Sequence, residues 1–293
     1  MATEVSSERF PISVIILTRD EERNIGDCVT SLDWADDIIV VDSHSSDRTI
    51  EVAQGVREDI RVFSHSFRDF ADQRNWALQN TGPRHRWILF FDADERCTHH
   101  CAQAIQRAVA APADNVGYYL CYRNFFLNRW IKHCTCFPSW QLRVLRAGRA
   151  QFQRAGHGQQ EVADGSLGYV REPYDHHGFS KGIGHWIARH NAYSSAEIEM
   201  IENLRKEPLR LTELFHIDPV RRRRCMKRIA VRIPFRPIAL FLYIYLLRGG
   251  FLDGRAGLIF CLLQLSHELQ LYAKLEEHRL QSDHDSKCGF RPG

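Results

Sequence analysis

The sequence predicts an α/β fold built on a parallel sheet, and two observations lead to that class. Short apolar runs of strand length alternate with longer polar segments of helix length through the first third of the chain. Several of these runs end abruptly in acidic side chains, as buried strands do where they reach the edge of a sheet. Because ligands of open α/β sheets bind beyond the carboxyl ends of the strands, we expect the functional site along that edge.

Each strand is predicted from a short run that is mostly apolar, and the run over 60–63 is the weakest of these signals. The first is continuous, as expected for a strand buried on both faces, and polar residues then open a helix. The second ends in a cluster of Ser, Asp and Thr that suits a turn and a helix N-cap. The expected strands are 11–17, 37–41, 60–63 and 87–91, with a helix over 69–80. Strands and helices in alternation imply right-handed parallel connections.

The run over 87–91 is followed by two carboxylates, Asp92 and Asp94, at positions i and i+2. Carboxylates on alternate positions of a tight turn can converge on one divalent cation. Mg²⁺ or Mn²⁺ is commonly held by one or two carboxylates together with substrate phosphates. We therefore expect a metal site here, and a solvated loop at a strand end is the alternative interpretation of this segment alone.

Four motifs resemble, in order and spacing, those of glycosyltransferase family 2. They lie at 14–25, 40–49, 73–78 and 92–95. Within that family the chain is similar to the bacterial β-1,4-glucosyltransferases that build lipopolysaccharide core and extracellular polysaccharide, well over 11–200 and less specifically to 277. The resemblance implies a GT-A fold, a Rossmann-like sheet with helices on both faces that binds a nucleotide sugar. A UDP-sugar is the expected donor.

The resemblance also implies roles for individual residues. Thr18 and Glu21 fall on the first nucleotide-binding loop, and Asp42 matches the carboxylate that contacts the uracil or the ribose. Arg74 matches a helix residue near the diphosphate or the base. Asp92 belongs to the paired-aspartate motif and is expected on the donor ribose.

One position departs from the family pattern. His44 stands where the family usually has Gly within Asp-x-Gly-Ser-x-Asp. A Gly there permits a positive φ and a close approach of the nucleotide. His44 must therefore adopt a rarer backbone conformation or redirect the loop, and the base contacts are the part of the site that this change concerns.

The implied transfer is inverting and needs a general base from the second half of the chain. The acceptor hydroxyl attacks the anomeric carbon in line with the departing diphosphate, so a carboxylate must accept its proton. Glu161 is the candidate catalytic residue, in a segment over 156–161 that resembles the His/Glu segment of this branch. Relatives have a compact Val-His-Glu, which leaves open whether His157, Glu161 or both face the acceptor. An ordinary surface loop is the alternative.

The segment over 173–182 continues the resemblance, which places a His near the diphosphate after a short strand. His176 is expected to join Asp94 as a ligand of Mg²⁺ or Mn²⁺, and Lys181 is expected to contact the donor phosphates. Adjacent side chains on a strand point to opposite faces. The assignment between His176 and His177 therefore stays open.

The C-terminal part combines a basic segment with apolar runs. No acidic residue lies between Asp218 and Asp253, and eight Arg and Lys residues cluster over 221–236. The apolar runs over 238–247 and 258–263 are shorter than the roughly 20 residues that span a bilayer. We expect a helical region that meets an anionic membrane surface as an interfacial or re-entrant hairpin. Buried helices or a homo-oligomer interface are the alternatives, and nucleic acid is not expected because no nucleic-acid-binding module accompanies the basic residues.

The expected organisation is a GT-A domain over 11–205 and a membrane-associating helical region over 206–278, with flexible tails over 1–10 and 279–293. The nine cysteines show no zinc spacing and no paired Cys-x-x-Cys motif, which favours reduced thiols in the cytosol. No signal peptide is expected, because the first ten residues are polar. The expected location is the cytoplasmic face of the bacterial inner membrane, as a peripheral or monotopic protein.

The expected function is transfer of a sugar from a nucleotide-sugar donor to a glycan or lipid-linked acceptor, in lipopolysaccharide or exopolysaccharide synthesis. A non-catalytic nucleotide-sugar-binding scaffold is one alternative, and the intact Asp92, Asp94 and Glu161 argue against it. A nucleotidyltransferase is another. It would carry a Gly-rich basic loop after the first strand, where this chain has acidic residues over 20–22.

Overall fold

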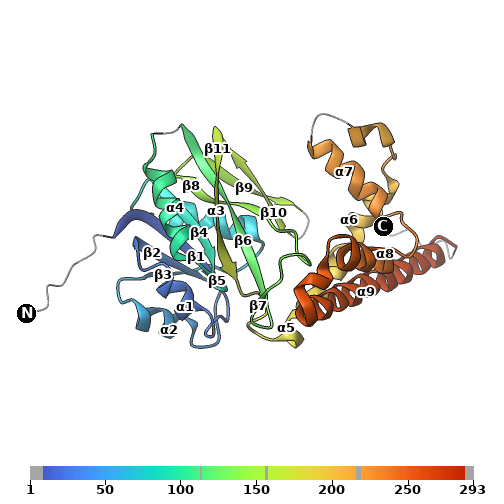
Figure 1. Ribbon diagram of the computed structural model, residues 1–293, viewed down its shortest axis with the longest axis horizontal. Coiled ribbons are helices and arrows are strands. Elements are labelled where there is room, and N and C mark those ends of the chain that lie inside the picture. The colour runs from blue at the N-terminus through green and yellow to red at the C-terminus, as the bar shows by residue number, and fades with distance from the viewer. Residues whose placement is uncertain (1–8, 113, 156–157, 216–218, 288–293) are drawn as a thin grey trace, which may run out of the picture. The chain divides into compact units, whose positions relative to one another are not determined.

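The computed structural model describes residues 9–112, 114–155, 158–215 and 219–287. The chain divides into two compact units, Met1–Lys181 and Gly182–Gly293. Figure 1 shows a sheet flanked by helices in the first unit and packed helices in the second. The division lies before helix α5 (Ile183–Ala196), so α5 and α6 (Ile198–Lys206) belong to the helical unit. The sequence-based boundary at residue 205 placed both helices with the sheet.

A mixed sheet organises the first unit, with strand order β3-β2-β1-β4-β8-β6-β11-β5 and β7 paired to β6 within the described residues. Its strands are β1 (Phe10–Thr18), β2 (Ala35–Asp42), β3 (Arg61–Ser64), β4 (Trp87–Asp92), β5 (Glu95–Arg96), β6 (Asn115–Phe126), β7 (Arg129–Trp130), β8 (Trp140–Arg146) and β11 (Ser166–His176). Strands β1 to β4 are parallel, which confirms the four predicted strands. β8 pairs antiparallel with both β4 and β6, so the parallel arrangement predicted from the first strands does not extend through the whole sheet, which is mixed.

Helices cover both faces of this sheet, as predicted. They are α1 (Ile25–Thr30), α2 (Thr49–Val56), α3 (Phe70–Asn80) and α4 (His99–Ala110). Successive side chains of a strand point to opposite faces, so Val14 and Ile16 of β1 join an apolar cluster with α1, α2 and α4. Ile15, between them, joins a second cluster that includes residues of α3. The continuous apolar run of β1 is thus explained by burial on two sides.

Helix α3 begins where the Asp69 carboxylate accepts a hydrogen bond from the backbone N–H of Asp72 at 2.8 Å. Such a cap satisfies one of the backbone donors left unpaired at a helix start, and α3 agrees with the helix predicted over 69–80. A two-stranded sheet, β9 (Ala150–Ala155) with β10 (Gly158–Ala163), is fastened to this helix. The Asn75 side chain donates to the Phe152 carbonyl at 2.7 Å and accepts from its N–H at 2.9 Å.

The second unit is helical. After α5 and α6 come η1 (Leu211–Phe215), α7 (Pro219–Ala230), α8 (Arg236–Leu242), η2 (Tyr243–Leu247), η3 (Gly250–Asp253) and the long α9 (Gly254–Lys287). Its small core joins Ile201, Val231, Leu271 and Leu275. The basic segment over 221–236 runs from α7 to the first residue of α8, and the two apolar runs fall in α8 with η2 and in α9. Within the described part of the chain, each helix is too short or too polar to cross a membrane.

Candidate active site

The carboxyl ends of β1, β2 and β4 meet at one edge of the sheet. Thr18 and Asp42 are register partners, and Asp92 pairs with Leu17, the residue before Thr18. Thr18 is buried, and none of the described residues bonds its Oγ1. Burying a hydroxyl without a hydrogen bond costs free energy, so this atom is suited to bond a ligand.

Two loops at this edge are tied together by hydrogen bonds. The backbone N–H of Asp20 donates to Ser45 Oγ at 2.8 Å, and that of Glu21 donates to Thr49 Oγ1 at 2.7 Å. The Asp42 carboxylate accepts the backbone N–H of Ser45 at 2.9 Å. The loop after β1 and the loop after β2 are therefore held as one surface around Asp42.

His44 adopts a left-handed backbone conformation, with φ of 58°. Of the two possibilities raised by the sequence, the structure therefore has the rarer conformation, and the loop follows the path that a Gly would take easily. The His44 side chain turns to Ser66, whose Oγ lies 3.0 Å from Nε2.

Asp92 lies in a largely buried network of charges. Its Oδ1 accepts from Arg74 at 3.1 Å and its Oδ2 from Arg143 at 3.0 Å, while Arg143 also contacts Glu95 at 2.5 Å. Burial alone would raise the pKa of Asp92, but the charges of Arg143 and Arg74 hold it below its ordinary value. Burial raises the pKa of Glu95 above the usual carboxyl range, although Arg143 opposes this shift. Arg143 and Arg74 therefore favour the ionised form of Asp92.

Arg74, which the resemblance matches to a residue near the donor diphosphate or base, is a buried member of this network. Its guanidinium lies 5.6 Å and 5.7 Å from the ring centroids of Phe90 and Phe152. One amino group donates to Gln159 Oε1 at 2.6 Å and the other to Asp92. Arg74 thus links the end of β4 to β10 and fixes the orientation of Asp92.

Asp94 and His176 come together at the same edge. His176 Nε2 lies 3.4 Å from Asp94 Oδ2, and its Nδ1 lies 2.8 Å from Asn124 Oδ1. His177 instead stacks on Phe125, with ring centroids 5.0 Å apart. Of the two histidines, His176 is therefore the one that faces Asp94. Burial lowers the pKa of His176, but Asp94 outweighs it and the net shift is upward.

Asp94 and His176 fit a divalent cation that is completed by substrate. No group of three or more His, Cys, Asp or Glu side chains suited to a metal occurs among the described residues. Mg²⁺ and its relatives are, however, often bound by one or two protein ligands together with phosphate oxygens and water. Neighbouring ligands of an octahedral ion at about 2.1 Å lie about 3 Å apart, close to the separation of this pair. Gly178 packs closely against the His176 ring, since a Cβ there would lie 2.8 Å from it, and so permits the ring to take this position.

Lys181 and Glu21 form an ion pair of 2.6 Å at the loop after β1. Lys181 Nζ also donates to the Arg19 carbonyl at 3.1 Å, and Glu21 accepts from Asn24 Nδ2. Burial raises the pKa of Glu21, and Lys181 opposes the shift. The structure therefore brings two of the predicted donor-binding residues into direct contact.

Glu161 lies on β10, half-buried, with Phe152 as its register partner. Side chains two positions apart on a strand share a face, so Glu161 lies on the same face as Gln159, which contacts Arg74. Burial, followed by the negative charge of Glu161, raises the pKa of Tyr119, so Glu161 and Tyr119 are within electrostatic reach. His157 lies outside the described residues.

Three residues of the site escaped the reasoning from sequence. Arg143 and Glu95 complete the charge network around Asp92, and Asn124 orients His176. Arg143 carried a usable signal, because it stands between the apolar residues Leu142 and Val144 on a strand. A buried Arg needs a carboxylate partner, and the nearest expected carboxylates were those after β4.

Structural comparison shows the fold class. The mannosyltransferase PcManGT from Pyrobaculum calidifontis, solved in complex with GDP-Man and Mn²⁺, matches with a TM-score of 0.50 at 12% sequence identity. The match covers 92% of this chain and 88% of that one. The two proteins therefore share a GT-A-like arrangement, a mixed α/β sheet with flanking helices.

Sequence comparison shows the family. Residues 13–177, more than half of the chain, match Glycosyl transferase family 2. The lipopolysaccharide core biosynthesis glycosyltransferase LpsC of Rhizobium meliloti (strain 1021) is 23% identical over 276 residues, which is 90% of this chain and 94% of LpsC. An uncharacterized glycosyltransferase of Rickettsia bellii (strain RML369-C) is 31% identical over 113 residues, 38% of this chain and 36% of that protein. With the paired carboxylates at the edge of a GT-A-like sheet, these matches make the chain a nucleotide-sugar glycosyltransferase that belongs to family 2.

Proposed function

We propose that the chain is an inverting, metal-dependent glycosyltransferase that moves a sugar from a UDP-sugar to a lipopolysaccharide-core or other lipid-linked glycan. The observation that carries this proposal is the pairing of Asp94 with His176 beside the carboxyl ends of β1, β2 and β4. A nucleotide diphosphate with its cation suits that donor set. The choice of acceptor is supported by the similarity to LpsC, which extends over nearly the whole of both chains.

The donor is proposed to lie along the edge formed by the two tied loops. The Thr18 hydroxyl and the Asp42 carboxylate, register partners at the ends of β1 and β2, would bond the nucleoside. Asp92 would accept from the ribose, because Arg143 and Arg74 keep it ionised. Arg74 acts here through Asp92 and is a positioning residue.

The transfer step is then a direct displacement. When bound, Mg²⁺ or Mn²⁺ would supply positive charge to the diphosphate. The acceptor hydroxyl oxygen forms the bond to the anomeric carbon while the bond from that carbon to the diphosphate oxygen breaks. The Glu161 carboxylate accepts the hydroxyl proton, with His157 as the next candidate, and Lys181 adds charge beside the phosphates.

The donor can be tested without an acceptor, because slow hydrolysis of a nucleotide sugar needs only water. We expect the purified chain to hydrolyse UDP-sugars with Mn²⁺ or Mg²⁺ and to leave GDP-mannose largely intact. Preference for the GDP-sugar would contradict the UDP assignment. With a lipopolysaccharide-core acceptor, NMR of the product should show an inverted anomeric configuration, and retention would contradict the role of Glu161.

We also propose that the helical unit attaches the enzyme to the cytoplasmic face of the inner membrane. The basic helix α7 is followed by a stretch rich in exposed large apolar side chains. They include Ile238, Leu242, Tyr243, Leu246, Leu247, Phe251 and Leu252, each at least 45% exposed. Basic residues attract anionic lipid at about 1 kcal/mol each, and apolar side chains enter the headgroup boundary.

Liposome sedimentation tests this attachment. Replacement of Arg221, Arg222, Arg223 and Arg224 by Ser should release the protein from anionic liposomes at lower salt, while donor hydrolysis is unchanged. Salt acts because exposed charges more than about 8 Å apart are screened at physiological ionic strength. If the fraction of protein that sediments with liposomes does not change with lipid charge, salt or the substitution, an oligomer interface is favoured instead.

A further inference from the structure

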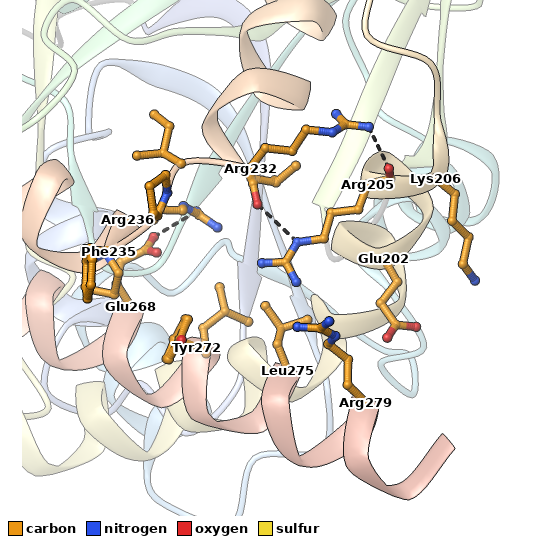
Figure 2. A pocket seen from close by; sticks show the side chains of 15 residues that line it. Glu202, Arg205, Lys206, Arg232, Phe235, Arg236, Glu268, Tyr272, Leu275 and Arg279 are labelled. Atoms are coloured by element: carbon orange, nitrogen blue, oxygen red, sulfur yellow. Dashed lines mark hydrogen bonds and ion pairs between the residues drawn. The ribbon is translucent and has the colours of Figure 1, made fainter. Parts of the chain in front are cut away.

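A cavity of about 510 Å³ lies within the helical unit, between α6, the segment over 231–237 and α9 (Figure 2). Its floor is apolar: Leu271 and Leu275 of α9 pack there with Val231, and Ile233, 42% exposed, adds accessible apolar surface to the lining. Its volume falls in the range of about 300–1,000 Å³ that small-molecule sites occupy. The cavity is thus large enough for a ligand with a polar and an apolar part.

The lining of this cavity is strongly basic. Five cationic side chains border it, those of Arg205, Lys206, Arg232, Arg236 and Arg279. The two carboxylates, Glu202 and Glu268, already have cationic or imidazole partners. Glu268 accepts from Arg236 at 3.0 Å, and Glu202 lies 3.0 Å from His278 Nδ1. Arg279 is also paired, with Glu276 at 3.1 Å, so the excess of positive charge in the cavity comes from Arg205, Lys206 and Arg232.

Two of the guanidinium groups donate to uncharged partners. Arg205 Nε donates to the Val231 carbonyl at 3.1 Å. Arg232 donates to the carbonyls of Arg205 and Glu207, both at 2.6 Å, and of Arg228 at 2.8 Å. These bonds fasten the end of α7 to the end of α6 and so build one wall of the cavity. Because a carbonyl carries no formal charge, they leave the positive charge of both groups in place.

Cationic and apolar groups are arranged in layers. In Figure 2 the side chains of Arg205 and Arg279 extend from α6 and α9 into the space above Leu275. The rim includes Phe235, which is 78% exposed and held by a left-handed backbone with φ of 53°. Tyr272 adds a second half-exposed ring. A ligand with a negative head and an apolar chain matches both layers.

We propose that this cavity binds the phosphate headgroup and the adjoining chain of an anionic lipid. A phosphate monoester carries a charge of about −1.5 to −2 at pH 7 and suits the fork of a guanidinium group. A free phosphate would leave the apolar floor unused, and an uncharged lipid would leave the cations unused. This site deepens the proposed membrane attachment by adding one stoichiometric lipid to a diffuse attraction.

Monomeric short-chain lipids separate this site from the attraction of a bilayer. Calorimetry of the full chain with dioctanoyl phosphatidic acid, below its micelle concentration, should show saturable one-to-one binding. Dioctanoyl phosphatidylcholine and inorganic phosphate should each bind at least about tenfold more weakly, a difference of about 1.4 kcal/mol. Equal binding of phosphatidylcholine, or equal binding of inorganic phosphate, would overturn the lipid-phosphate assignment.

Variants locate the binding in the cavity. The double change Arg205→Gln with Arg279→Gln removes two cations and keeps Arg236 beside the buried Glu268. It should lower the affinity of the protein for phosphatidic acid by about tenfold or more. Arg255→Gln, an exposed change of the same kind elsewhere on α9, is the matched control and should bind as the parent does. Equal affinity in the double variant and the control would overturn the proposal.

A second variant protects the test against misfolding. Phe235→Asn removes the apolar rim at an exposed position, and Asn tolerates the left-handed conformation there. This variant should bind phosphatidic acid more weakly than the parent and keep the same thermal unfolding midpoint. Unchanged affinity for phosphatidic acid would count against the site. Donor hydrolysis, measured on the same proteins, should be unaffected by every change. Its absence from the parent would tell against the proposed transfer and leave the lipid result standing.

Discussion

Asp37 and Asp92 are two carboxylates of the same sheet that both pair with arginine but differ in their exposure to solvent. Asp37 lies near the start of β2 at 1% exposure, and its carboxylate accepts from Ser13 Oγ at 2.6 Å, Arg61 at 2.8 Å and the Arg84 N–H at 3.0 Å. Asp92 lies at the end of β4 with a side chain 34% exposed. Both are paired with arginine, but only Asp92 is open to a ligand.

The partners of the two carboxylates differ in the same way. Around Asp37 the hydrogen bonds tie β1, β2 and β3 together. At the Asp92 end, Nε and Nη1 of Arg143 and Oγ1 of Thr18 are buried without a partner among the described residues. Buried donors and acceptors are normally satisfied, so these three atoms are suited to bond a ligand. The amino end of the sheet is built for stability and the carboxyl end for a ligand.

The sharpest way to break this comparison is Asp94→Ala. The Asp94 carboxylate would give charge to a cation, so its loss should remove several kcal/mol of metal-dependent binding and lower the affinity for UDP with Mn²⁺ by about 10³-fold. The unfolding midpoint should stay unchanged. Calorimetry decides the question, and equal affinity in variant and parent would end the metal role.

Glu161→Gln should produce the next largest effect. Removal of a general base commonly lowers turnover by about 10²-fold or more, and an amide of the same shape should keep the donor affinity. Transfer to a core acceptor and UDP affinity should be measured on the same preparation. Turnover at the parent rate would move the proton to another group, with His157 tested next.

Asp37→Asn should change stability and spare the site. Breaking a buried ion pair costs about 3 kcal/mol, so the urea midpoint should fall while Mn²⁺-dependent UDP affinity is kept. Burial alone would raise the pKa of Asp37, but bonds from Arg61, Ser13 and Arg84 lower it below 3.8.

The lowered pKa of Asp37 predicts how the stability of the protein depends on pH. A carboxyl with a depressed folded pKa adds stability above its unfolded pKa and loses it as the pH falls through the folded value. The parent should therefore lose stability below about pH 4, and Asp37→Asn should show less of that loss. Parallel pH profiles in the two proteins would contradict this account.

Arg74→Lys should have the smallest effect. It tests the link that Arg74 makes between Asp92 at the end of β4 and Gln159 on β10. Arg74 bonds Gln159 and Asp92 at once, and a single ammonium group cannot reproduce that fork. We expect turnover to fall by about tenfold and donor KM to rise. A purely structural role would lower the unfolding midpoint and leave both kinetic constants intact.

The strands of the parallel half could be predicted from sequence because their signal is local. Each is a short apolar run, and the alternation of burial along β1 needs only the geometry of a strand. The antiparallel insertion of β8 could not be predicted, because residues 140–146 carry no information about which distant strands they pair with. The end of the sheet unit at Lys181 is equally non-local, since it depends on which helices α5 and α6 pack against.

The residues of the candidate site also fall into those that local sequence patterns indicate and those that they do not. Asp42 and Asp92 end strands and Asp94 follows one closely, so strand ends and the family resemblance pointed to them. Arg143 arrives from 51 positions further along the chain to reach Asp92, and Asn124 from 52 positions before His176. Which residues so distant in sequence become partners depends on the order of the strands in the sheet. Local sequence patterns carry no information about that order.

The insertion of β8 also dictates an order of assembly. Contacts between residues far apart in sequence form late, because closing a long loop costs entropy before the contact returns any free energy. During synthesis, the chain up to β4 emerges well before Arg143, so Asp92 and Arg74 can meet while Glu95 is still hydrated. We expect β8 to enter its slot between β4 and β6 in one of the last folding steps, and Glu95 to lose its water only then. Pulse-labelled hydrogen exchange would show this as late protection of the amides over 140–146, and early protection there would contradict it.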